Sequence, residues 1–272
     1  MLKTIAAVTP ILVVTGFLYK LLIGRPMFAF DYNGIMRYGG GTIPAFLAAG
    51  AYSSSIAYSM MFRHSKKIIY LAFAFASLFA CVLSGSRMPT VCATICIFTI
   101  IFASIKNGVL RIIFVFSGVV TITVGLLTVG GDLLARFSSG SSSGRDLIWK
   151  SVMIWADRYP WTGVGFGHQH LLISDYVQKL THTRATHNEY VRLAGELGYI
   201  GSTFFIIGIF MMLYFAPVKK GISDTLVTLI VLGTFFLYSY SDNTMSAAYC
   251  MLAPIAYALG SGLTTETDQK TE

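Results

Sequence analysis

The stretch from Ile68 to Ser84, IIYLAFAFASLFACVLS, decides the fold class, because it contains no charged side chain from end to end. A helix of about 20 residues of this kind crosses the hydrocarbon core of a membrane. The rest of the chain has the same character, since 55% of its 272 residues are hydrophobic and only 12% are charged. Soluble domains carry about 25% charged residues. The sequence therefore predicts an all-α fold, a polytopic bundle of transmembrane helices.

Further apolar runs on both sides of this stretch supply the other spans. We expect the first run to be retained as a helix, because Pro10 and Lys20 interrupt it and no cleavage pattern follows it. A membrane domain over 1–263 and a polar cytoplasmic tail over 264–272 follow from these runs. They predict about eight spans, at residues 4–23, 42–62, 68–84, 89–105, 109–129, 190–215, 222–240 and 245–262.

Basic residues in the short loops predict the orientation of the bundle. The positive-inside rule places the loops richer in lysine and arginine, and with them both termini, in the cytoplasm. The outer side then carries Arg25, Arg37 and Arg87 together with one large, partly helical loop at 131–188. Four of the five histidines lie in that loop, so titratable side chains are concentrated on the outer face. The cytoplasmic basic residues are Arg63, Lys66, Lys67, Lys106, Arg111, Lys219 and Lys220.

The net charge of +8 does not indicate a nucleic-acid-binding protein. The basic residues occur singly or in pairs between apolar runs, whereas binding along a phosphate backbone needs clustered charge. The cysteines do not indicate a metal site either, because Cys92 and Cys96 lie inside an apolar run without further ligands nearby. We interpret them as small buried hydrophobic residues.

Two arginines on the outer side are candidates for anion binding. Arg87 follows Ser84-Gly85-Ser86 at the outer end of one predicted span, and a guanidinium there either anchors the helix at the interface or binds a phosphate. Arg145 lies in the first turn of a predicted helix, Leu147 to Arg158, with Ser143 as the expected N-cap. A cation in that turn opposes the helix dipole, and a bound anion would offset this cost. The alternative is an ordinary surface arginine that pairs with Asp146 or Asp157.

The end of the large loop holds a candidate base. Histidine is a residue type that can act as a base at a hydroxyl group. His187 precedes Asn188, which we expect to cap the helix that follows. Glu196 lies within that apolar helix, and Arg192 is its expected partner, since an intramembrane carboxylate is costly alone. Upstream, Gly163-Val164-Gly165-Phe166-Gly167 after Pro160-Trp161 predicts a tightly packed turn rather than a nucleotide-binding loop. These patterns leave three classes open: a transporter, a channel, and a membrane enzyme acting on a lipid-linked anion.

In this order, the motifs strongly resemble the family of bacterial O-antigen ligases and O-antigen polymerases. The resemblance covers roughly residues 37 to 260. It rests on Ser84-Gly85-Ser86-Arg87, on Gly144-Arg145 followed by Trp149, on Tyr159-Pro160-Trp161-Thr162-Gly163-Val164-Gly165-Phe166-Gly167, and on His187-Asn188-Glu189-Tyr190-Val191-Arg192-Leu193-Ala194-Gly195-Glu196-Leu197-Gly198-Tyr199-Ile200-Gly201.

The resemblance implies transfer of an undecaprenyl-diphosphate-linked glycan at the periplasmic face of the bacterial inner membrane. The acceptor is lipid A-core for a ligase, the next lipid-linked repeat unit for a polymerase, or protein for some relatives. The resemblance also implies a reaction that needs no metal ion or cofactor. Arg87 and Arg145 would hold the diphosphate, and His187 would act as the base at the acceptor hydroxyl. Asn188, Tyr190 and Trp161 would contact substrate, while Arg192, Glu196, Gly163, Gly165 and Gly167 would support the site.

The chain departs from this family at its front, because family members usually have ten to twelve spans. We therefore expect about four N-terminal helices to be missing relative to the family pattern, through a late start, a truncation or a split gene. Two other hypotheses stay open. One is a transporter or flippase for a lipid-linked glycan, which would need charged residues deep in several helices. The other is an inactive remnant that keeps the site residues without the front helices.

Overall fold

The computed structural model describes residues 1–30, 36–116, 144–219 and 221–263. They form two compact units, one from residues 1–103 with 207–272 and the other from residues 104–206. The prediction of one membrane domain over 1–263 with a separate tail is not tested by this division and stays a prediction.

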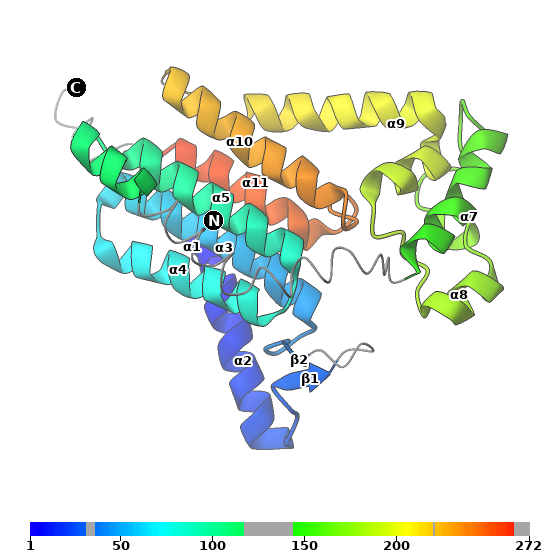
Figure 1. The fold of residues 1–272 in the computed structure, drawn as a ribbon, viewed down its shortest axis with the longest axis horizontal. Helices are drawn as coiled ribbons and strands as arrows, with labels where there is room; N and C mark the ends of the chain where they lie inside the picture. Colours follow the sequence, from blue (N-terminus) through cyan, green and yellow to red (C-terminus); the bar gives the residue numbers. More distant parts are fainter. Residues whose placement is uncertain (31–35, 117–143, 220, 264–272) are drawn as a thin grey trace. The chain divides into compact units, whose positions relative to one another are not determined.

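The first unit is a bundle of helices with one small β-hairpin (Figure 1). The strands of the hairpin are antiparallel, and Phe28 pairs with Tyr38. The elements are α1 (Leu2–Ala6), α2 (Val8–Ile23), β1 (Phe28–Phe30), β2 (Met36–Tyr38), α3 (Pro44–Ser65), α4 (Ile68–Leu83), α5 (Arg87–Ser104), α10 (Ile222–Ser239) and α11 (Ala248–Ser261), together with the end of α9 (Glu189–Phe215).

Helix α3 forms the centre of the first unit, where it contacts α1, α2, α4 and α11. Alanine, glycine and serine dominate its buried surface, and small side chains let helix backbones approach one another closely. Ser54 also satisfies the backbone at the break between α1 and α2, since its Oγ donates to the Ile5 carbonyl and accepts from the Thr9 N–H. The serines thus serve packing and hydrogen bonding at once.

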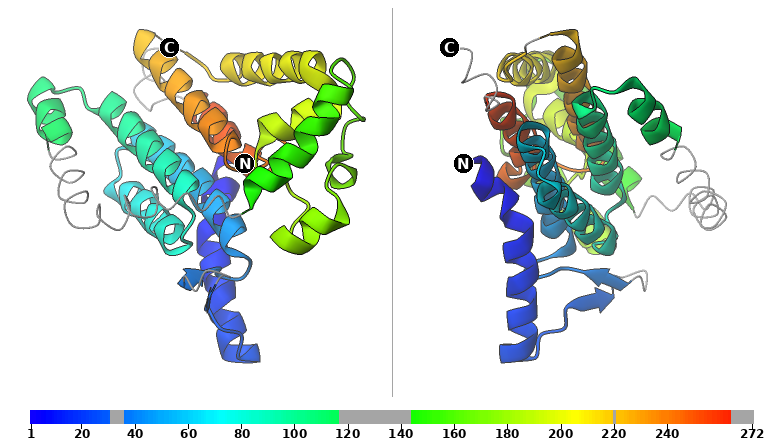
Figure 2. Two further views of the ribbon diagram at one scale, coloured as in Figure 1. Left: turned by 45° about the vertical axis from the view of Figure 1, so that its right-hand side comes forward. Right: turned by 90° about the vertical axis from the view of Figure 1, so that its left-hand side faces the viewer.

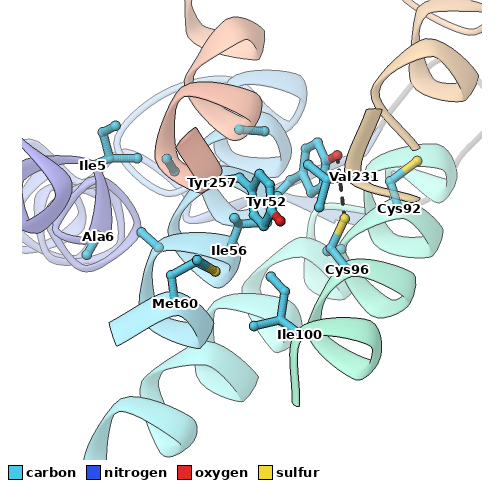
Figure 3. Packing of buried hydrophobic residues seen from close by; sticks show 14 of the residues in the cluster. Ile5, Ala6, Tyr52, Ile56, Met60, Cys92, Cys96, Ile100, Val231 and Tyr257 are labelled. Atoms are coloured by element: carbon cyan, nitrogen blue, oxygen red, sulfur yellow. Dashed lines mark hydrogen bonds between the residues drawn. The ribbon is translucent and has the colours of Figure 1, made fainter. Parts of the chain in front are cut away.

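Polar side chains also join the helices within this apolar core. The Tyr52 hydroxyl on α3 lies 3.0 Å from Oγ1 of Thr234 on α10, and the same Oγ1 lies 3.1 Å from the Cys96 thiol on α5. Figure 3 shows Tyr52 and Cys96 among Ile56, Met60 and Ile100. The cysteines are buried and free, as expected for small hydrophobic residues.

Four helices in the described residues are long and apolar enough to cross a membrane, which makes the chain an integral membrane protein. They are Leu2–Ile23 (α1 with α2), α5, α9 and α10, and α4 and α11 are shorter apolar helices. The expected run at 42–62 is the helix α3, which is long but serine-rich and buried. Most of the expected run at 109–129 lies outside the described residues, so about eight spans remain a prediction.

The second unit contains the described part of the predicted large loop, residues 144–188, and this part is partly helical as expected. Its elements are a helix over residues 108–116, α7 (Arg145–Arg158), the short 3-10 helix η1 (Gln169–Leu171), α8 (Asp175–Thr181) and the first part of α9. Ile148 and Val152 of α7 are buried against Leu172 and Ile173. This small apolar core packs α7 against the segment that carries η1. Figure 2 shows the ribbon of this unit from two further sides, with α7 in green.

Candidate active site

Helix α7 begins at Arg145, so Arg145 lies in the first helical turn as predicted. The expected N-cap was wrong. Gly144 occupies that position with a φ of 75°, a left-handed conformation that glycine adopts without steric cost, and Ser143 lies outside the described residues. Arg145 is partly exposed, and Asp146 adds a carboxylate to the same turn.

Helix α9 is broken at Gly198, where φ is 67° and ψ is 179°. The sequence predicted one continuous helix over 190–215, and the break divides it. Beyond Gly198, the Tyr199 N–H donates to the carbonyl of Pro160 instead of to the helix, at 2.7 Å. A side chain at position 198 would place its Cβ 2.6 Å from that carbonyl oxygen. Glycine is therefore required here by both conformation and space.

The glycine turn after Pro160 supplies hydrogen-bond donors to the backbone of the broken helix. The carbonyls of Gly195 and Glu196, freed by the break, accept hydrogen bonds from the N–H groups of Val164 (3.1 Å) and Gly165 (2.8 Å). Gly163 is so close that an added Cβ would lie 2.3 Å from the Glu196 carbonyl carbon. The turn thus docks into the broken helix, which satisfies buried backbone groups that would otherwise be costly. Gly163, Gly165 and Gly167 all have positive φ, as a tight turn requires.

A buried ion-pair cluster lies in the helical segment before the break. Arg192 forms salt bridges with Glu189 and Glu196, and the exposed fraction is 2% for Arg192 and 0% for both glutamates. Its guanidinium also lies over the ring of Phe166, 5.2 Å from the centroid. The pairing of Arg192 with Glu196 was predicted. The second oxygen of Glu196 accepts from the backbone N–H of Gln169 at 2.8 Å, so the cluster also ties α9 to η1.

His187 lies at the start of this segment in a left-handed conformation, with a φ of 48°. Such a φ is uncommon for residues other than glycine and persists only where the surroundings hold it. The next residue, Asn188, is buried, and its Oδ1 accepts from the N–H groups of Tyr190 (3.0 Å) and Val191 (3.2 Å). Asn188 is therefore the N-cap of α9, as the sequence predicted. His187 itself is half-buried.

Trp149 links α7 to the backbone beside His187. Its indole N–H donates to the carbonyl of Thr186 at 2.8 Å. Arg145 lies one turn before Trp149, and residues four apart share a helix face. The helix that carries Arg145 is thus hydrogen-bonded, through Trp149, to the backbone of the residue before His187. Trp161 is 70% exposed, and Tyr190 is half-buried.

Arg87, in the first unit, is the first residue of α5 and is exposed. The turn before it contains Gly85 with a φ of 69°, and a Cβ there would lie 3.2 Å from Cγ and 3.4 Å from Nε of Arg37. A second arginine from β2 therefore borders the Ser84–Arg87 turn. Sequence reasoning used Arg37 only to assign the topology, because nothing in the sequence shows that the hairpin folds back onto this turn.

The comparison with known proteins agrees with this architecture. The apolar helices indicate an integral membrane protein. The family model described as O-Antigen ligase matches residues 72–206, and through this region the chain belongs to the O-antigen ligase family. None of the curated proteins compared with the chain matches it. The matched region contains Arg87, Arg145 and His187, although the match does not assign their roles.

Proposed function

We propose that the protein transfers a glycan from undecaprenyl diphosphate to an acceptor hydroxyl at the periplasmic face of the inner membrane. The acceptor is lipid A-core if the protein is a ligase and the next lipid-linked repeat unit if it is a polymerase. The observation that carries this proposal is the O-antigen ligase match, which includes Arg87, Arg145 and His187 in one region. Both termini lie in the cytoplasm in this topology.

The proposed reaction is a displacement at the anomeric carbon of the donor. The acceptor oxygen forms the new bond to this carbon, and the bond from the carbon to the diphosphate oxygen breaks. The acceptor proton passes to the imidazole of His187, and undecaprenyl diphosphate leaves with the bonding electrons. An imidazole can act as a general base at a hydroxyl group.

The arginines would bind and stabilise the diphosphate. Guanidinium groups form bidentate, charge-assisted hydrogen bonds with phosphate oxygens, and these strengthen as negative charge grows on the leaving group. Arg145 lies at the start of α7, and the positive end of the helix dipole there also favours an anion. The exposed Trp161 and the half-buried Tyr190 are aromatic residues of the kind that stack on sugar rings. Asn188 is engaged in capping α9, so in this proposal it orients His187.

Complementation of a strain that lacks its own ligase or polymerase tests the proposal. The chain, any longer reading frame that contains it, and His187→Ala and Arg87→Ala variants are expressed, and the lipopolysaccharide ladder is read on a gel. His182→Ala is the matched control, because His182 also has a positive φ and is exposed in the same unit. Immunoblots of membranes check that all variants reach equal levels.

We expect a ladder with the parent sequence and with His182→Ala, and no ladder with His187→Ala or Arg87→Ala. Chains attached to lipid A-core identify a ligase, and a ladder in place of single-repeat bands identifies a polymerase. A full ladder from His187→Ala at equal expression contradicts the proposed chemistry. Accumulation of lipid-linked glycan on the cytoplasmic side, without a transfer defect, would favour a flippase.

A further inference from the structure

Gln169 bridges two parts of the candidate site that are separate in sequence. Its backbone N–H donates to Oε1 of Glu196, 2.8 Å away. Its side-chain Oε1 faces Thr186, at 3.3 Å from the hydroxyl and 3.5 Å from the backbone nitrogen. Because Arg192 holds the same Glu196 carboxylate, η1 is anchored to the buried ion-pair cluster and in turn contacts the residue before His187.

Thr186 is fixed from a second direction as well. It is fully buried, and its carbonyl accepts from the Trp149 indole at 2.8 Å. Its hydroxyl also lies 3.2 Å from the carbonyl of Asn188. Asn188 is held in turn by its capping bonds to Tyr190 and Val191. The residues on both sides of His187 are therefore anchored, whereas His187 itself keeps an uncommon left-handed backbone.

We propose that Gln169 is a positioning residue for His187, acting through Thr186. The contacts constrain the backbone that carries the imidazole, and a reactive group displaced by about 1 Å can lose about a hundredfold in rate. This inference rests on the proposed function, because it concerns the geometry of the base proposed above. It adds residues outside the motifs that identified the family, and it gives η1 a role in the reaction.

The test uses the purified full chain in lipid nanodiscs, with lipid-linked O-antigen from the source strain as donor. Release of undecaprenyl diphosphate is the readout, since ligase and polymerase reactions share it. Gln169→Ala and Thr186→Val remove the bridging contacts. Gln169→Glu keeps an acceptor oxygen at position 169, and Thr186→Ser keeps the hydroxyl at position 186. Gln178→Ala is the control, because Gln178, on α8 in the same unit, accepts a hydrogen bond from Arg184 instead.

We expect Gln169→Ala and Thr186→Val to lower kcat by about tenfold or more while KM for the donor stays nearly unchanged. Gln169→Glu, Thr186→Ser and Gln178→Ala should retain most of kcat. A second readout is independent of activity: in protein labelled with ¹⁵N-histidine, the ring signals of His187, assigned by their loss in His187→Ala, should shift in Gln169→Ala and not in Gln178→Ala.

The outcomes separate this inference from the proposed function. If His187→Ala is inactive while Gln169→Ala keeps the parent kcat and unshifted His187 signals, the positioning role is wrong and the proposed function stands. If His187→Ala keeps the parent kcat, the proposed chemistry fails, and the positioning role for that chemistry fails with it. Equal loss of kcat in Gln169→Ala and Gln169→Glu would also overturn the inference.

Discussion

At the scale of single residues, the main feature is a guanidinium buried between two carboxylates. Arg192 has an exposed fraction of only 2%, and its partners Glu189 and Glu196 have none. Burying these charges costs free energy that the pairing returns only when every partner is present. The cluster is therefore a poor source of net stability but a strict constraint on geometry, because it ties α9, η1 and the ring of Phe166 together.

Removing the central cation should be strongly destabilising. We expect Arg192→Leu to cost about 3–5 kcal/mol, since it leaves two buried carboxylates without a counter-charge. Arg184→Leu is the matched control, because Arg184 pairs with Asp175 at the surface, where an ion pair is worth about 0–1 kcal/mol. The temperature at which monodisperse protein is lost on heating in detergent measures the stability of both variants. Equal melting temperatures for the two variants would show that the buried cluster is not structurally required.

The contact of Arg37 with Gly85 leads to a second prediction at this scale. If the Ser84–Arg87 turn binds the donor diphosphate, the guanidinium of Arg37 contributes positive charge beside it. We expect Arg37→Ala to raise KM for the lipid-linked donor by about tenfold, the cost of one charge-assisted hydrogen bond. Arg25→Ala is the control, because Arg25 is exposed in the loop that precedes the same hairpin. An unchanged KM for Arg37→Ala would limit the site to Arg87 in this unit.

The break in α9 and the glycine turn form one structure at the scale of elements. Two carbonyls released by the break receive N–H groups from the turn, and the turn carbonyl of Pro160 receives the N–H of Tyr199. The two glycine-containing motifs, far apart in sequence, are therefore complementary halves of one contact. This explains in physical terms why the chain needs glycine in both.

A methyl group at position 198 should disrupt the contact between the glycine turn and α9. Gly198→Ala forces alanine into a φ of 67° and places Cβ against the Pro160 carbonyl, so we expect a cost of at least about 1–3 kcal/mol. Gly208→Ala is the control in the same helix, because nothing lies within 4 Å of a Cβ added there. Gly208→Ala should be neutral or stabilising, since alanine favours a helix over glycine. Thermal stability in detergent compares the two, and equal stability would show that the turn does not depend on Gly198.

The elements also show how far sequence reasoning reaches. Hydrophobic runs predicted α2 through α5, α10 and α11 within a few residues, because burial and lipid exposure both select apolar side chains. The cap by Asn188 and the pairing of Arg192 with Glu196 followed from local spacing along one helix. The break at Gly198 did not, because it depends on a partner turn more than 30 residues earlier. Likewise, the contacts of Gln169 with Thr186 and of Arg37 with Gly85 are tertiary and leave no periodic signal.

At the scale of the whole molecule, the proposed function depends on the side of the membrane on which the polar groups lie. The serine-rich helix α3 is buried in the centre of the first unit, so a long helix with modest hydropathy can still belong to a membrane bundle. Arg145 and His187, in the second unit, belong to the predicted outer loop. Orientation therefore decides whether the proposed base meets a periplasmic acceptor.

Cysteine labelling tests this orientation directly. The native cysteines at 81, 92, 96 and 250 are buried, so a membrane-impermeant maleimide should label the parent protein only weakly in whole cells. Lys179→Cys on α8 and Lys67→Cys between α3 and α4 are a matched pair, since both lysines are exposed. With α8 in the periplasm, we expect labelling of Lys179→Cys in intact cells and of Lys67→Cys only after the inner membrane is permeabilised. The reverse pattern would place the His187 loop in the cytoplasm, away from any acceptor exposed at the outer face, and would exclude the proposed periplasmic transfer.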